Sequence, residues 1–148
     1  MITTTTFSWI LIAFGMITCI PLLFAQMILL LNPGSQKAKD LLIGKGENWR
    51  DDSHYRIALA LSWADWLVFF PLFVLGAVGI LLNELWGFVL FATAGTIQLY
   101  INTFLWFFER DIVSKSLSPL AYYTYYWGNF MYWGLLTLVY CLYILSSH

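Results

Sequence analysis

Asp65 is the residue whose type and position most clearly require a chemical explanation. It is the only ionisable residue in the apolar run from Ala58 to Leu82, and Trp63 and Trp66 flank it. A carboxylate deep in a membrane helix costs about 2.5–3.5 kcal/mol on insertion scales, so it normally faces a protein interior, a cavity or a partner. We therefore take Asp65 as a candidate catalytic group and as a candidate anchor for a ligand.

Amide side chains occur at a similar depth in the other apolar stretches. Counted from the side that carries the charged connections, five polar residues fall roughly 9–15 Å inside their helices at ~1.5 Å per residue: Gln26, Asp65, Gln98, Asn102 and Asn129. Such groups often join helices through hydrogen bonds worth ~0.6 kcal/mol each. Because a carboxylate is a poor choice for that purpose alone, the set favours a polar pocket.

Aromatic residues next to this polar layer would form the walls of the pocket. Phe69 lies one helical turn from Asp65, and Tyr126 and Trp133 lie one turn before and after Asn129. The predicted ligand-binding set contains Gln26, Asp65, Phe69, Gln98, Asn102, Tyr126, Asn129 and Trp133.

Two further groups of titratable residues are weaker candidates. Glu109 ends the third apolar stretch, where a helix-end charge that reaches water explains it at least as well as a catalytic role. Asp51, Asp52 and His54 lie close together, but no second histidine or further carboxylate pattern accompanies them. We expect no metal and no cofactor.

The composition indicates one compact membrane domain. Of the 148 residues, 61% are hydrophobic and 10% are charged, whereas soluble domains average ~25% charged residues. A net charge of −1 offers no nucleic-acid footprint. Aromatic residues make up 20% of the chain, which exceeds what interfacial belts alone would need, so some rings are expected to line an interior.

Four apolar spans are predicted, at about 7–31, 55–82, 85–108 and 119–145. Asn32-Pro33-Gly34 ends the first span, and Asn83-Glu84 forms a tight turn between the second and third. Gln36–Ile43 is expected to be a short interfacial helix that Gly44-Lys45-Gly46 ends. Helices with tight connections pack as antiparallel neighbours, so residues 1–148 are predicted to form an all-α, up-down bundle of four transmembrane helices.

All lysines and arginines lie in or beside the first and third polar connections. With four crossings these connections share one side, and the positive-inside rule then places both termini on the non-cytoplasmic side. We therefore predict a multi-pass integral membrane protein. Its predicted location is the endoplasmic reticulum in a eukaryote, or the inner or plasma membrane in a bacterium.

The order of these features resembles the EXPERA-domain family, which includes a sterol isomerase and the sigma-two receptor. The similar features are Ile20-Pro21 followed by Gln26, Asp65 followed by Pro71, Trp86, Gly95–Tyr100, Phe107–Asp111, Ser118–Tyr122, and Asn129 with Trp133. The resemblance covers most of the chain at low identity. It implies four helices around a lipophilic pocket for sterol-like ligands, with Asp65 as the second-helix acid and Asn129 and Trp133 lining the pocket.

The sequence departs from the pattern of the family's isomerase. Isomerisation needs one group that protonates a double bond and another that removes a neighbouring proton. Gln26 stands where the family's isomerase has an acid, and glutamine cannot donate that proton. The family generally places its termini in the cytosol, against the positive-inside rule here, so the sidedness stays open.

The sequence is consistent with two functions. The first is binding of a sterol-like or other lipophilic molecule, including a cationic one, in an aromatic pocket anchored by Asp65, with isomerase-type chemistry as a possible extension. The second is a non-catalytic subunit of a larger membrane complex, or a homodimer, in which the polar layer only joins helices and outward aromatic residues form the interface.

Overall fold

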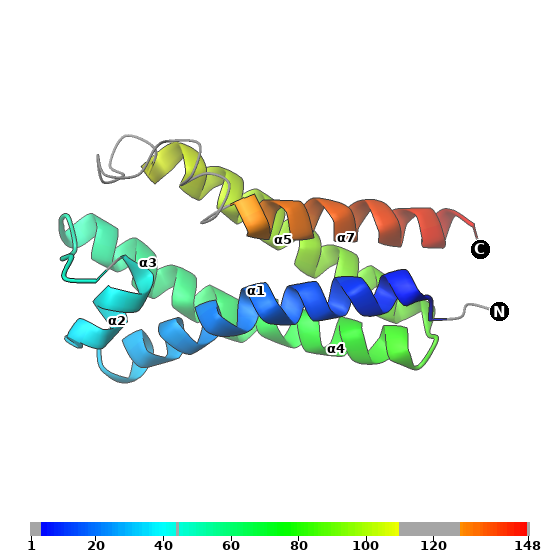
Figure 1. Ribbon diagram of the computed structural model, residues 1–148, viewed down its shortest axis with the longest axis horizontal. Helices are drawn as coiled ribbons and strands as arrows, with labels where there is room; N and C mark the ends of the chain where they lie inside the picture. Colours follow the sequence, from blue (N-terminus) through cyan, green and yellow to red (C-terminus); the bar gives the residue numbers. More distant parts are fainter. Residues whose placement is uncertain (1–3, 44, 110–127, 148) are drawn as a thin grey trace. The chain divides into compact units, whose positions relative to one another are not determined.

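The computed structural model describes residues 4–43, 45–109 and 128–147, and the side chain of Glu109 is outside this description. Every regular element in these ranges is a helix (Figure 1). In chain order the elements are α1 (Thr6–Leu31), α2 (Gln36–Leu42), α3 (Asp52–Ala64), the π-helical segment η1 (Asp65–Phe69), α4 (Phe70–Leu81), α5 (Leu85–Glu109) and α7 (Gly128–Ser146). The all-α prediction is confirmed over the described residues.

Within the described ranges, four helices are long and apolar enough to cross a membrane. They are Thr6–Leu31, Asp52–Leu81 (which joins α3, η1 and α4), Leu85–Phe108 and Gly128–Ser146. The first three match the predicted spans within a few residues, because long apolar runs between polar connections are the strongest signal in such a sequence. Residues 119–127 of the fourth predicted span lie outside the described residues.

The chain divides into two compact units, which we treat separately. The larger unit combines Met1–Met16 with Leu72–His148, and the smaller unit is Ile17–Pro71. The larger unit therefore holds the start of α1, most of α4, and all described residues of α5 and α7. The smaller unit holds the rest of α1 together with α2, α3 and η1.

Small residues let the helices of the larger unit approach closely. A Cβ on Gly76 would lie 2.7 Å from the backbone nitrogen of Phe91, so α4 and α5 touch through backbone atoms. Gly95 of α5 and Gly134 of α7 form a similar contact, since a Cβ on Gly134 would lie 2.5 Å from the carbonyl oxygen of Gly95. Backbone approach through small residues is typical of membrane helix pairs.

The predicted turn between the second and third spans is present in the larger unit. Asn83 has a φ of 62°, and its N–H donates to the Ile80 carbonyl while the Glu84 N–H donates to the Gly79 carbonyl. This pair of bonds is the Schellman ending of a helix, and asparagine accepts the left-handed conformation at low cost. The Asn83 side chain also accepts from the backbone N–H of Thr4 at 2.6 Å.

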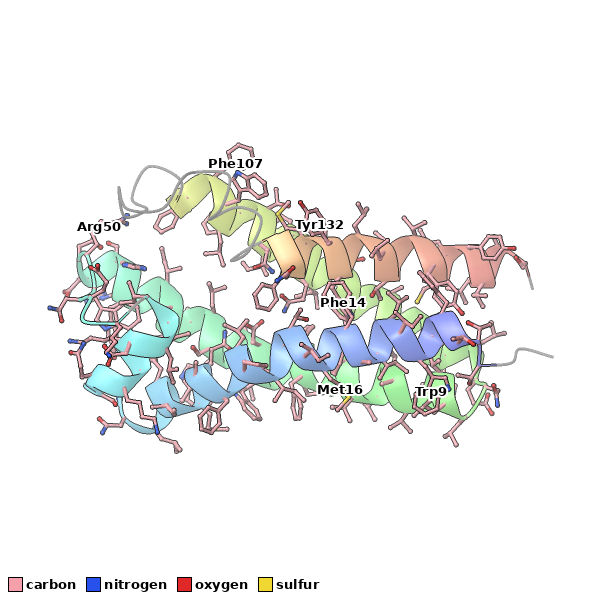
Figure 2. The ribbon with its side chains drawn as sticks, in the orientation of Figure 1. Trp9, Phe14, Met16, Arg50, Phe107 and Tyr132 are labelled. Atoms are coloured by element: carbon pink, nitrogen blue, oxygen red, sulfur yellow. The ribbon has the colours of Figure 1, made fainter. Side chains whose placement is uncertain are left out.

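The polar connection of the smaller unit contains the predicted short helix, observed as α2. Its C-terminal residues precede Gly46, whose φ of 81° favours glycine. Asp51 then caps α3 by accepting from the backbone N–H of His54 at 2.8 Å. The Arg50 side chain, labelled in Figure 2, donates to the other carboxylate oxygen of Asp51 at 2.9 Å.

Candidate functional site

Asp65 lies at the start of η1, a wide helical turn inside the continuous helix Asp52–Leu81. Here the backbone N–H of Phe70 donates to the carbonyl of Asp65, five residues earlier, instead of four. Pro71 follows directly, and it has no N–H for the regular bond to Leu67 and would clash with that carbonyl in a regular helix. Short π segments of this kind are frequently found at functional sites.

Asp65 and Trp66 both bind one turn of α1 within the smaller unit. The Gln26 side-chain Nε2 donates to the Asp65 Oδ2 at 2.6 Å. The Trp66 Nε1 donates to the backbone carbonyl of Leu23 at 3.1 Å. Adjacent residues of η1 thus hold residues three apart on α1, which fixes the orientation of the carboxylate against a second helix.

The Asp65 carboxylate is enclosed, and no cation of the described residues pairs with it. Its residue is 7% exposed, and Gln26 is 4% exposed. Among the described residues the only ion pair joins Arg50 to Asp51, so the group that stabilises Asp65 there is a neutral amide. The other polar atom of that amide, Gln26 Oε1, is buried and has no hydrogen-bond partner in the described part of the chain.

Aromatic side chains lie beside Asp65 along the same helical segment. Phe69, one turn after Asp65, is 1% exposed. The rings of Trp66 and Phe70 lie 5.0 Å apart in a tilted arrangement. Rings near a carboxylate offer electron-rich faces to a cation in addition to the negative charge itself.

Gln98 and Asn102 form a separate polar cluster in the larger unit, and both are 1% exposed. The Asn102 Nδ2 donates to the side-chain oxygen of Gln98 at 2.8 Å and to its backbone carbonyl at 2.7 Å. The Gln98 Nε2 and the Asn102 Oδ1 have no hydrogen-bond partner among the described residues. The bonds described for this pair thus stay within α5 and do not join it to another helix.

Trp133 is a packing residue of the larger unit. It is fully buried, and its Nε1 donates to the Leu11 carbonyl at 2.9 Å. Its ring meets those of Phe73 and Phe91 edge-on, each with centroids 5.6 Å away. Because protein atoms occupy both its N–H and its ring, we do not include Trp133 in the proposed ligand contacts.

The remaining predicted site residues divide into exposed ones and ones that the structure does not describe. Asn129 lies in the first turn of α7 and is exposed. Tyr126 lies outside the described residues, as does the side chain of Glu109 at the end of α5. Within the described ranges, no three His, Cys, Asp or Glu side chains are grouped as metal ligands would be.

Sequence reasoning missed two features of the site. The wide turn η1 was not expected, although Pro71 six residues after Asp65 is a signal that the regular hydrogen bonding must break nearby. The Trp66 side chain donates to the backbone carbonyl of Leu23. Every residue has such a carbonyl, so the residue type at this position does not indicate the bond.

A scan against protein-family models, a search of curated proteins and a search of solved structures each returned no match for this chain.

Proposed function

We propose that the chain is a multi-pass membrane protein, with its long helices in an up-down bundle, that binds a lipophilic molecule carrying a protonated amine. One observation carries the proposal: the Asp65 carboxylate is buried in an apolar helix, and its described partner is the neutral amide of Gln26. The four membrane-length apolar helices support the membrane location.

A cationic ligand follows from the electrostatics of this carboxylate. A buried charge is costly unless an opposite charge pairs with it, and a neutral amide supplies a hydrogen bond but no net charge. Gln26 holds the Oδ2 of Asp65, which leaves the Oδ1 as the acceptor that we assign to the ligand ammonium. The face of Trp66 would add cation–π attraction of about 0.5–2 kcal/mol.

The resemblance to EXPERA-domain proteins is part of the same proposal, since that family binds sterol-like lipophiles beside a second-helix acid. We propose binding without bond rearrangement. An isomerase needs both an acid and a base at the substrate, and the side chain in contact with Asp65 is an amide that neither gains nor loses a proton near neutral pH.

A matched set of probes tests the charge requirement. N,N-dimethyldodecylamine, dodecanol and dodecanoate share one alkyl chain and differ in head-group charge. We expect purified protein in detergent to bind the amine at least tenfold more tightly than the alcohol and not to bind the carboxylate, as measured by native mass spectrometry. Asp65→Asn should remove the preference for the amine.

Glu84→Gln is the control for that variant, because it makes the same carboxylate-to-amide change at an exposed position after α4. It should keep the wild-type preference. Equal binding of the amine and the alcohol by wild-type protein would contradict the proposal and would favour a role as a subunit without a ligand.

A further inference from the structure

A cavity that is open to the surface lies in the polar connection of the smaller unit and includes none of the residues of the Asp65 site. Its volume is about 390 Å³, within the range of ~300–1,000 Å³ that small-molecule sites occupy. It is lined by Pro33, Gly34, Lys39, Trp49, Asp51, Asp52 and Tyr55. Aromatic rings and charges of both signs therefore meet around one space.

Trp49 and Tyr55 form a fixed aromatic wall of this cavity. Their ring centroids lie 5.7 Å apart at an angle of 61°. The ring of His54 also packs against Trp49, with centroids 5.3 Å apart and nearly perpendicular planes. Rings held by such contacts present their faces without further ordering, which suits recognition of an ammonium group.

The two carboxylates at the cavity differ in whether other described residues bind them. Asp51 caps α3 and accepts from Arg50, so both of its oxygens are occupied. Asp52 lies in the first turn of α3, and no hydrogen bond or ion pair to another described residue engages its side chain. Asp52 is therefore the carboxylate available to a ligand cation.

Two residues of the cavity lining carry N–H donors that the described residues do not fully engage. The Trp49 Nε1 is enclosed by protein and has no acceptor among the residues that the structure describes. The Lys39 Nζ donates to the Asn48 side-chain oxygen at 3.0 Å, which leaves two of its three N–H groups for other partners. An oxyanion such as phosphate would accept from both residues.

We propose that this cavity binds a phosphate ester that carries an ammonium group. The ammonium lies against Asp52 and the Trp49 and Tyr55 rings, and the phosphate accepts from Trp49 and Lys39. Pro33 and Gly34 follow the end of α1, and Asp52 begins the second membrane-length helix. With the helices in a membrane, as proposed above, the cavity lies at head-group depth, where a zwitterionic phospholipid supplies this group.

The test compares two short-chain phospholipids with the full-length protein in detergent. Phosphatidylethanolamine and phosphatidylglycerol share the phosphate and acyl chains, but only the first carries an ammonium. We expect native mass spectrometry to show phosphatidylethanolamine binding roughly 2- to 30-fold more tightly, the range of a cation–π contact. Asp52→Asn should reduce this difference, because only the rings then attract the ammonium, whereas the control Glu47→Gln, an exposed carboxylate outside the cavity lining, should keep it in full.

Further arms separate the parts of the proposal. Trp49→Phe keeps a ring but removes the N–H, so it should weaken both lipids by about tenfold. If soluble phosphoethanolamine binds as tightly as the lipid, the cavity recognises the phosphate and ammonium groups alone, and the ligand is a soluble metabolite and not a lipid. Equal affinity for the two lipids in wild-type protein, or an unchanged preference in Asp52→Asn, would overturn the proposal. Asp65→Asn should leave the preference intact, which separates this site from the amine site.

Discussion

Two aspartates of the smaller unit show how differently one side chain can be used. Asp51 lies at an exposed helix start, where a guanidinium and a backbone N–H occupy its oxygens. Asp65 is buried, and the amide of Gln26 is its described partner. The arrangement of Asp51 is that of a helix cap. The arrangement of Asp65 leaves a buried carboxyl group without a cationic partner among the described residues, which is the basis of the proposed amine site.

Asp65→Asn should raise the stability of the ligand-free protein while it removes the preference for the amine. An amide of the same shape avoids the cost of a buried unpaired charge, so we expect the free energy of unfolding to rise by about 1 kcal/mol. Thermal unfolding in detergent measures this. A loss of more than about 2 kcal/mol would show that the carboxylate is needed for folding itself.

In the variant Gln26→Lys, the new lysine side chain should pair with Asp65 in place of a ligand. A lysine ammonium at this position, on the residue that now donates at 2.6 Å, would neutralise the carboxylate and compete with any ligand cation. We expect a folded protein that no longer binds N,N-dimethyldodecylamine. Gln26→Met is the control: it removes the hydrogen bond, lowers stability by about 1.5–3 kcal/mol, and keeps amine binding. Amine binding that persists in Gln26→Lys would place the ligand elsewhere.

The sequence predicts single site residues better than their partners. Asp65 is evident because an apolar run surrounds it, and its similar depth to Gln26 predicts that the two belong together, as observed. Trp133 is predicted to line the pocket, and its described contacts are with the Leu11 carbonyl and the Phe73 ring; the pocket role stays a prediction. Residue type alone does not distinguish a tryptophan that meets a ligand from one that packs in the interior.

At the scale of helices and turns, the start of α3 depends on the ionised form of Asp51. The bond from Arg50 and the N–H of His54 hold the pKa of this carboxyl below its usual range. Its stabilising effect is therefore complete above the unfolded pKa of ~3.9 and is lost as the pH falls through the lower folded pKa. We expect Asp51→Asn to reduce the loss of stability on acidification below about pH 4, as measured by denaturation at several pH values. An unchanged pH profile would contradict this role.

The contact between α4 and α5 should tolerate no added side-chain atom. A Cβ on Gly79 would lie 2.5 Å from the Cα of Gly87 and 2.6 Å from the Trp86 ring. We expect Gly79→Ala to lower the free energy of unfolding by about 1–3 kcal/mol because the helices must separate. Gly34→Ala is the control, since its nearest neighbour beyond the adjacent residues is the Asn32 side chain at 4.0 Å. Equal stability of the two variants would argue against a tight contact.

Element boundaries were largely predictable, but the internal geometry of the second long helix was not. Asn32-Pro33-Gly34 and Asn83-Glu84 mark helix ends through known turn chemistry, and both ends are observed where expected. The wide turn η1 ends two residues before Pro71. A proline predicts that a helix is disturbed, but not whether a kink or a π turn results.

For the molecule as a whole, hydropathy predicts the number of long helices and says less about their arrangement. Four membrane-length helices follow from apolar runs that match the ~30 Å core of a bilayer. The up-down bundle stays a prediction, because short connections favour it without fixing which faces meet. The two compact units also had no signature in the sequence, since their boundaries at Met16 and Pro71 fall inside continuous helices.

The most direct test of the central claim is mass spectrometry of the small molecules that co-purify with the protein, with wild type beside Asp65→Asn. We predict a defined lipophilic amine in the wild-type sample that is absent from the variant, with the same bulk phospholipid in both. Identical small-molecule profiles in the two samples would contradict the proposal that Asp65 anchors a ligand.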